Sequence, residues 1–175
     1  MKLNSIWTIG HSTKSIEEFI AMLQSFQIKL VIDIRRFPGS RPYPHFNKDA
    51  LQASLSANKI EYAHMEKLGG RRKPVGNSHN NAWRLAAFRG YADYMETDDF
   101  HEAVEELELL ASKKAVAYMC SEAVWWSCHR SLVSDYLKFK GWLVVHIMGI
   151  NKSGEHPYTK PARIEDNKLV YTLSQ

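Results

Sequence analysis

Five short apolar runs, which alternate with segments of helical periodicity, constrain the fold of this chain more than any other feature. Most of the runs are rich in β-branched residues and all are shorter than a buried helix, so each predicts a strand. They are residues 7–9, 30–34, 60–64, 115–120 and 142–147. Strands that are buried on both faces and separated by helices are typical of parallel sheets. We therefore predict a three-layer, Rossmann-like α/β fold with a mainly parallel sheet of about five strands.

The segments between these runs predict the helices. Apolar residues recur at the i, i+3, i+4 spacing in residues 16–26, and Ser15 with Glu18 matches a capping box at the start of this helix. Further helices are predicted at 49–57, 83–95, 99–111 and 132–139. Asp166-Asn167 predicts the turn of a small C-terminal hairpin. Because no linker of Pro, Gly or Ser divides the 175 residues, we expect one domain over 1–175.

Composition excludes several classes of protein. With 45% hydrophobic and 24% charged residues, the chain resembles neither a disordered nor a collagen-like sequence. It has no apolar run of the roughly 18 residues that a membrane span needs, and its first residues do not resemble a secretion signal. Two cysteines do not make a disulfide framework. We therefore expect a cytoplasmic protein with reduced thiols and no membrane partner, and no prediction of its oligomeric state follows.

The charges are unevenly distributed along the chain. Residues 35–90 hold eleven Lys or Arg against three acids, whereas residues 91–111 hold eight acids and no base. The basic residues fall mostly in predicted loops, which favours an anionic ligand over a solvated helix face. In the loop 35–46 the bases alternate with aromatic rings, as in surfaces that bind nucleic acid. The expected partner is therefore an anionic small molecule or a nucleic acid.

Polar side chains follow each predicted strand. In open α/β sheets, ligands bind beyond the carboxyl ends of the strands, so these residues are expected to share one edge. They are His11 and Ser12, then Asp33, Arg35 and Arg36, then His64, then Cys120 and Glu122, and finally His146. Histidine recurs three times among them and suits proton transfer near neutral pH. We interpret this edge as the candidate active site.

The segment 120–130 carries the most reactive groups. Cys128 falls at the first turn of a predicted helix, where the positive end of the dipole would lower the pKa of its thiol and make it nucleophilic. Arg130 adds a fork of donors for a phosphate or carboxylate. Cys128 and Arg130 are too close in sequence to form the wide cradle of the cysteine phosphatases. An ordinary half-buried cysteine, with Arg130 paired to Glu122, is the alternative that involves no ligand.

Taken together, these residues predict an enzyme that acts on a phosphate-bearing substrate, a nucleotide or a nucleic acid, as a hydrolase or transferase. The predicted catalytic residues are Cys128 as nucleophile, Glu122 as acid or base, His11 and His146 as proton shuttles, and Asp33. The predicted substrate-binding residues are Ser12, Arg35, Arg36, Arg71, Arg72, His129 and Arg130. No cofactor and no metal are expected.

Three alternatives remain open. The basic and aromatic loops could belong to a nucleic-acid-binding module without catalysis. Cys120 and Cys128 could instead form a thiol or metal redox sensor. With His129 and either Glu122 or a nearby histidine they could supply three or four zinc ligands, although their spacing matches no standard zinc signature. Asp33 and Glu122 could act as a carboxylate pair on an ester or glycosidic bond.

The chain also resembles a bacterial family known as domain of unknown function 488. The matching segments are 8–12, 33–35 with Pro38 and Ser40, 68–72, Phe88 with Tyr91 and Met95, 119–122, 128–130 and 146–147. They cover nearly the whole chain in the same order. One departure is Ser121, where the family pattern usually has alanine. The resemblance implies a Rossmann-like domain in the bacterial cytoplasm, but it implies no reaction.

Overall fold

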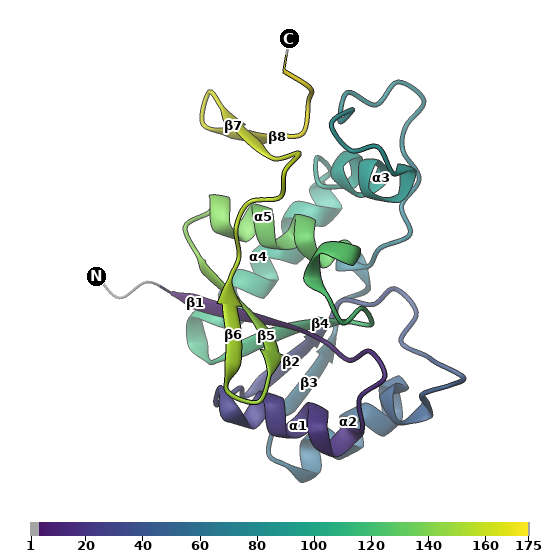
Figure 1. The fold of residues 1–175 in the computed structure, drawn as a ribbon, viewed down its shortest axis with the longest axis vertical. Helices are drawn as coiled ribbons and strands as arrows, with labels where there is room; N and C mark the ends of the chain where they lie inside the picture. Colours follow the sequence, from purple (N-terminus) through teal and green to yellow (C-terminus); the bar gives the residue numbers. More distant parts are fainter. Residues whose placement is uncertain (1–3, 175) are drawn as a thin grey trace.

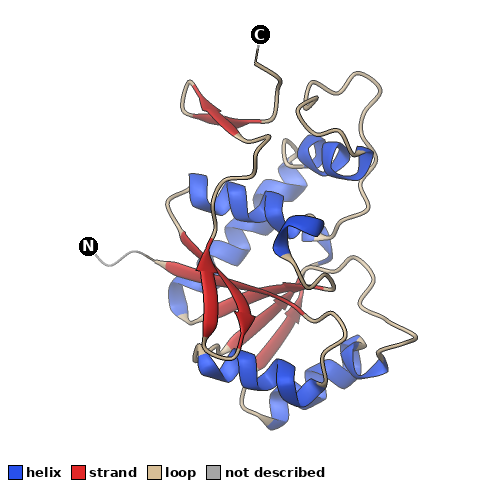
Figure 2. Cartoon of the chain, in the orientation of Figure 1, coloured by secondary structure: helices blue, strands red, loops and turns tan. Residues whose placement is uncertain are grey.

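A twisted sheet lies between two layers of helices in the computed structural model of the protein, which describes residues 4–174 (Figures 1 and 2). Its strands are β1 (Ser5–Gly10), β2 (Leu30–Asp33), β3 (Glu61–His64), β4 (Val116–Cys120), β5 (Leu143–Gly149) and β6 (Lys152–Glu155). The helices are α1 (Ile16–Ser25), α2 (Lys48–Ala57), α3 (Ala86–Tyr94), α4 (Asp98–Lys113) and α5 (Arg130–Phe139). The predicted α/β fold with a mainly parallel sheet is therefore confirmed.

The strands are ordered β3-β2-β4-β1-β5-β6, and all pairs are parallel except that of β5 with β6. The chain first builds outward from β1 to β2 and β3, and then returns to insert β4 between β2 and β1. α1 leaves β1 on one face of the sheet, and α5 leaves β4 on the other (Figure 1). Connections that diverge in this way leave a crevice at the carboxyl ends of adjacent strands. That crevice is where the candidate site lies.

Alternating residues of the central strands feed two separate cores. In β2, Leu30 and Ile32 pack with α3, α4 and α5, whereas Val31 packs with α1 and α2. All four residues of β2 are buried, which explains why this strand has a continuous apolar sequence rather than an alternating one. The two cores together hold the strand ends in fixed positions.

Local signals explain several boundaries. The Ser15 side chain accepts a hydrogen bond from the Glu18 backbone N–H, as the capping box predicts. Asp166 and Asn167 both adopt positive φ angles, of 49° and 59°, and connect β7 (Arg163–Glu165) to β8 (Lys168–Val170). The predicted C-terminal hairpin is thus confirmed.

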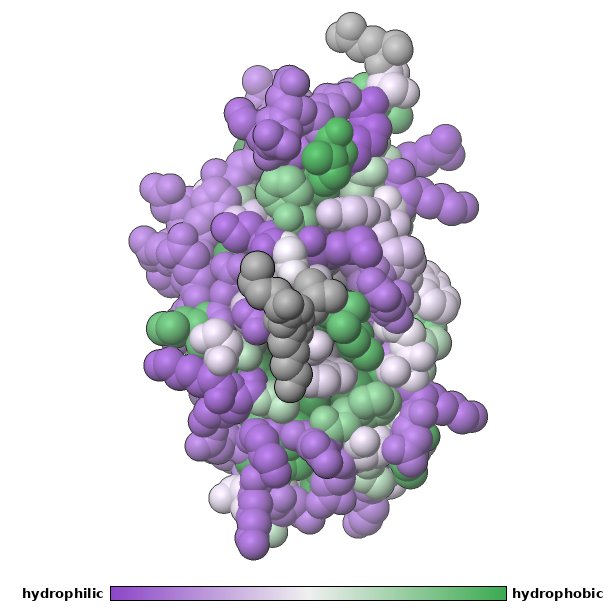
Figure 3. Space-filling model, turned by 90° about the vertical axis from the view of Figure 1, so that its left-hand side faces the viewer, coloured by the Kyte–Doolittle hydropathy of each residue, from purple (hydrophilic) through white to green (hydrophobic). Residues whose placement is uncertain are grey.

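The sequence does not predict four of the elements: β6 and the 3₁₀ turns η1 (Pro44–Phe46), η2 (Glu66–Leu68) and η3 (Trp125–Ser127). β6 is an edge strand of polar residues and glycine, so it lacks the apolar alternation by which strands are recognised. No helix within residues 4–174 is long and apolar enough to cross a membrane. On the face turned toward the viewer in Figure 3, hydrophilic residues surround scattered apolar ones.

Candidate functional site

A pocket of about 540 Å³ opens at the carboxyl ends of β1, β2 and β4. It is lined by residues from four separate segments, three of which directly follow one of these strands. The lining residues are His11, Ser12, Thr13, Arg35, Arg36, Phe37, Gly39, Ser40, Tyr43, Gly70, Arg71, Cys120, Ser121, Glu122, Cys128 and His129. Of the twelve residues that the sequence predicted for the site, eight line this pocket: His11, Ser12, Arg35, Arg36, Arg71, Glu122, Cys128 and His129.

A close backbone approach at Gly10 shapes the floor of the pocket. A Cβ at this position would lie 1.6 Å from the carbonyl oxygen of Glu122, so no residue with a side chain fits. The backbone N–H groups of His11 and Ser12 donate to the carbonyl oxygens of Cys120 and Ser121, at 3.0 and 2.9 Å. The segments after β1 and β4 are thereby joined, and His11 and Cys120 line the same pocket.

Asp33 serves to orient Arg35. The carboxylate of Asp33 is fully buried and accepts hydrogen bonds from the backbone N–H, Nε and Nη2 of Arg35, as well as from the hydroxyl of Tyr62. Nη2 also donates to the carbonyl oxygen of Phe46 at 2.8 Å. Burial and the charge of Asp33 raise the pKa of Tyr62, which therefore stays a hydroxyl donor. The acceptor capacity of Asp33 is occupied by these contacts, and it does not line the pocket.

His11 is held as a neutral base at the pocket wall. Burial lowers its pKa to about 4, and this outweighs the hydrogen bond that Nδ1 makes with the Ser12 carbonyl oxygen at 2.9 Å. Its ring stacks on Phe46 with centroids 4.4 Å apart. With Nδ1 as the donor, Nε2 remains an acceptor and lies 3.4 Å from Nη1 of Arg35.

Two further arginines line the pocket without a carboxylate partner among residues 4–174. Arg36 donates from Nη1 to the carbonyl oxygen of Arg71, at 3.1 Å. The guanidinium groups of both lie over the ring of Phe37, which is 59% exposed. Arg72 does not line the pocket; it lies 3.7 Å over the ring of Tyr94 and donates to the carbonyl oxygen of Gly69. The neighbouring arginines therefore face different environments.

Cys120 and Cys128 form a close thiol pair, with their sulfur atoms 2.8 Å apart. Cys128 also accepts a hydrogen bond from the Arg130 backbone N–H at the start of α5. Burial raises the pKa of both thiols, but the hydrogen bond between them and the charge of Arg130 lower the pKa of Cys120 to about 7. The same hydrogen bond raises the pKa of Cys128 further. Of the two thiols, Cys120 is therefore the one that loses its proton first, and the Cys128 thiol can donate to the resulting thiolate.

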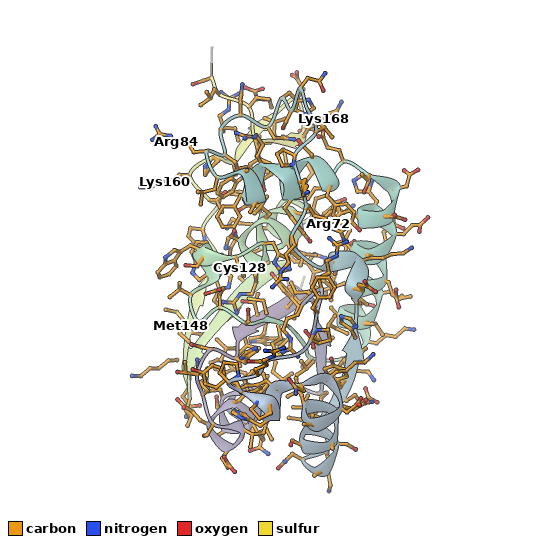
Figure 4. All side chains as sticks on the ribbon, turned by 90° about the vertical axis from the view of Figure 1, so that its right-hand side faces the viewer. Arg72, Arg84, Cys128, Met148, Lys160 and Lys168 are labelled. Atoms are coloured by element: carbon orange, nitrogen blue, oxygen red, sulfur yellow. The ribbon has the colours of Figure 1, made fainter. Side chains whose placement is uncertain are left out.

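Arg130 is the first residue of α5, and its charge acts on both thiols. Figure 4 shows Cys128 near the middle of the molecule. The side chain of Arg130 is 2% exposed, and Nη2 donates to the backbone carbonyl oxygens of Glu122 and Ala123. Nε and Nη1 have no hydrogen-bond partner among the described residues. The alternative in which Arg130 pairs with the Glu122 carboxylate is therefore wrong, since Nη2 reaches the backbone instead. A buried guanidinium without a carboxylate favours a thiolate nearby.

Glu122 and His129 complete the pocket wall. The carboxylate of Glu122 is exposed and makes no hydrogen bond or ion pair within the described part of the chain. Nε2 of His129 pairs with the carbonyl oxygen of Ile34 at 3.0 Å, and burial lowers the pKa of this histidine to about 4. Nδ1 of His129 lies so close to Gly70 that a Cβ there would be 2.9 Å away. His129 thus anchors the basic loop to α5 and is itself neutral.

His146 lies outside the pocket. β5 continues to Gly149, so His146 is within the strand rather than at its end. It is paired with Thr8 of β1 and with His156, and the ring of Trp125 stacks on it with centroids 4.7 Å apart. The prediction placed His146 at the sheet edge because the apolar run ends there, but pairing with β6 extends the strand.

Two further residues support the pocket without lining it. Tyr62 orients Asp33 through a hydrogen bond that no sequence motif predicts. Phe46, an aromatic residue of the loop 35–46, is buried under that loop, stacks on His11 and accepts a hydrogen bond from Arg35 at its carbonyl oxygen. The prolines around Phe46 were the only local signal, since they predict a fixed loop. No group of three or more His, Cys, Asp or Glu side chains in residues 4–174 is arranged to hold a metal ion.

The comparisons with known proteins give one match. The family described as "Domain of unknown function DUF488" matches residues 15–137, which include the loops after β2 and β4 and most of α5. No curated protein and no solved structure matches the chain. The match covers more than half of the chain, and the resemblance in its motifs is therefore confirmed: the chain belongs to the DUF488 family of uncharacterised domains.

Proposed function

We propose that the protein is an enzyme that acts on a phosphate-bearing substrate, a nucleotide or a nucleic acid, in the pocket at the sheet edge. One observation carries the proposal. Two arginines and one carboxylate that have no partner of opposite charge among residues 4–174 line the same pocket as a thiol pair in which the pKa of Cys120 is lowered. Anions that carry a reacting group are the ligands that such a combination suits. We also propose that the enzyme acts in the cytoplasm, where thiols such as these stay reduced.

In this proposal, the arginines bind the phosphate. Arg36 and Arg71 supply donors at the pocket mouth, and Arg35 is already oriented by Asp33. Because Arg35 is fixed before the ligand arrives, little side-chain entropy is lost on binding. The hydroxyl of Ser12, a residue that also lines the pocket, adds a neutral donor.

The chemistry follows from the thiol pair and Glu122. The sulfur of Cys128 attacks phosphorus while its proton passes to the Cys120 thiolate. A sulfur–phosphorus bond forms, and the bond from phosphorus to the leaving oxygen breaks. Glu122, which begins the step as the carboxylic acid, donates a proton to that oxygen, and Cys120 keeps the proton that it took from Cys128. Water then attacks phosphorus and returns a proton to Glu122, so inorganic phosphate leaves and the thiolate is regenerated. His146 takes no part in these steps because it does not line the pocket.

A turnover screen tests the proposal. The purified protein is incubated with nucleotides, short DNA and RNA, and simple phosphate esters, and phosphate release is measured. We expect turnover of one class, reduced at least about 100-fold by Cys128→Ser and by Glu122→Gln. Glu165→Gln on β7 is the matched control, since Glu165 is exposed and outside the pocket. Binding that weakens steeply with salt, without turnover, would instead identify a nucleic-acid-binding module.

The distance of 2.8 Å between the sulfurs favours a second candidate function, a thiol redox sensor. Two thiols this close can each lose one electron and one proton to hydrogen peroxide, forming a disulfide and two waters. Such oxidation lowers the mass by about 2 Da and protects both cysteines from alkylation. If both remain alkylatable after mild peroxide treatment, the sensor is excluded and the enzyme proposal is unaffected.

A further inference from the structure

A second hollow, of about 360 Å³, adjoins the pocket. It shares Gly70, Arg71, Cys128 and His129 with the first, so the thiol of the proposed reaction borders both. The start of α3 forms its other wall. Its volume lies within the range that small-molecule groups occupy in binding sites.

The lining of this hollow differs sharply from that of the pocket. Its remaining walls come from Leu85, Ala86, Ala87, Phe88 and Tyr91, with Ser127 adding one hydroxyl. Arg71 is its single charged side chain, because burial lowers the pKa of His129 and keeps that ring neutral. One wall is thus mainly apolar, whereas the adjoining pocket is mainly cationic.

The apolar wall is both rigid and open. Phe88 packs against Trp83 with ring centroids 5.0 Å apart, and the hydroxyl of Tyr91 donates to the Leu68 carbonyl oxygen at 2.7 Å. Leu85 is nevertheless 64% exposed. An exposed leucine beside small alanines and fixed rings leaves apolar surface that a ligand can cover.

We propose that this hollow holds an uncharged ring of the substrate, joined to the phosphate that the arginines bind. The inference rests on the proposed function. A group attached to phosphorus at Cys128 can extend into the hollow, because Cys128 lines both spaces. The substrate class is therefore a phosphate ester of an aromatic or nucleoside alcohol. Phosphate esters of short alkyl or strongly charged alcohols would leave the apolar wall uncovered.

A binding series tests the inference. Thermal shift or calorimetry compares inorganic phosphate, methyl phosphate, phenyl phosphate, 1-naphthyl phosphate and adenosine 5′-monophosphate. We expect the ring-bearing esters to bind about tenfold or more tightly than methyl phosphate, as expected when roughly 60 Å² of apolar surface is covered. Phenyl or naphthyl phosphate binding best would indicate an aryl substrate, and the monophosphate binding best a nucleoside one.

Variants locate the ring. Ala87→Trp fills the hollow, so the ratio of aryl to methyl affinity should fall toward one. Leu85→Ala should reduce the ratio of aryl to methyl phosphate affinity by several-fold. Leu109→Ala on α4 is the matched control, since Leu109 is 56% exposed outside both spaces and should leave the ratio unchanged.

The outcomes separate the two proposals. If phosphate and all the esters bind with equal affinity, the inference of a ring subsite is wrong and the proposed phosphate site stands. If ring-bearing esters bind best but Ala87→Trp does not change the ratio, the ring lies elsewhere and the inference is also wrong. If neither phosphate nor any ester binds, the proposed function itself fails.

Discussion

Two clusters of histidine and acidic groups lie on this sheet, and they differ in how much of their hydrogen-bonding capacity is used. The first is the pocket at the strand ends. The second, the histidine network, runs from Thr8 through His146 and His156 to Asp135 of α5. Asp135 accepts further hydrogen bonds from Thr159 and Tyr171, and all its partners are protein groups. In the pocket, by contrast, Glu122 and two arginines have no partner of opposite charge among residues 4–174.

The contrast teaches that residue types alone do not distinguish a site from a structural network. A histidine chain ending on an aspartate is a familiar catalytic arrangement, yet here it is sealed by Trp125 and ties the segment after β6 to α5. Unused donors and acceptors are what leave room for a ligand. The following predictions test whether the two clusters are as different in energy as in geometry.

Asp135→Asn is expected to have the largest effect. The asparagine amide places an NH₂ where the carboxylate accepts hydrogen bonds, leaving buried donors unpaired. We expect a loss of about 3–5 kcal/mol in the free energy of unfolding, measured by urea titration. Glu122→Gln should change this free energy by less than about 0.5 kcal/mol, since that carboxylate is exposed and has no partner in the described part of the chain. Equal effects of the two substitutions would abolish the distinction between network and pocket.

Trp125→Ala should open the histidine network to water. The Trp125 ring stacks on His146 and meets His156 edge-on, with centroids 4.8 Å apart in the second contact. Its removal should lower the free energy of unfolding by about 2–3 kcal/mol and raise the pKa of His146. NMR titration of the histidine ring protons measures this pKa. Trp126→Ala is the matched control, because Trp126 is 56% exposed and should cost less than about 1 kcal/mol. A titration of His146 that Trp125→Ala leaves unchanged would show that other groups exclude the water.

Histidines of both regions should make stability depend on pH. Burial, with the charges of His156 and Arg130, lowers the pKa of His146 to about 2, and burial lowers the pKa of His11 and His129 to about 4. Below the ordinary pKa of 6.5, the unfolded chain binds protons that the folded chain does not. Stability must therefore fall as the pH falls from 7 to 5, by about 2 kcal/mol for each such histidine.

Urea titrations at pH 7, 6 and 5 measure this dependence. A bound phosphate should raise the pKa of His11 and His129 in the pocket, while the pKa of His146 stays unaffected. The contribution of His11 and His129 to the pH dependence of the free energy of unfolding should then become smaller. His146→Gln should make the slope shallower in the absence of ligand. Stability that is constant between pH 7 and 5 would show that these histidines are accessible to protons in the folded protein.

The sequence predicts the strands and helices well because each depends on local periodicity. The order of the strands depends instead on which of them pair across the sheet, so the insertion of β4 between β2 and β1 has no local signal. The pocket is likewise predicted only in part, because local sequence identifies the residues that follow each strand but not the contacts between strands. Residues that follow strands can be read from the chain, and most of them do meet at one edge.

What remained invisible depends on contacts between distant segments. The sequence raises a pairing of Cys120 and Cys128 only as an alternative, because the path of the loop between them through η3, and not its composition, brings the two sulfurs together. The role of Asp33 likewise depends on Tyr62, a residue of another strand. A catalytic carboxylate and one that orients an arginine have the same sequence signature, and only the occupied hydrogen bonds of Asp33 separate them.

Arg36 and Arg72, two arginines of the basic segment 35–90 in different surroundings, give the smallest expected effect. Arg36 lines the pocket, whereas Arg72 lies over Tyr94 outside it, although both belong to the basic segment that predicts an anion site. Arg36→Ala should weaken the binding of phenyl phosphate about tenfold and make it less sensitive to salt, because a phosphate contact is lost. Arg72→Ala should change the affinity less than about twofold, and Lys160→Ala, which removes an exposed charge elsewhere, should behave the same way. If all three substitutions weaken binding equally, the anion responds to the net charge of the protein, and the pocket geometry does not select among its arginines.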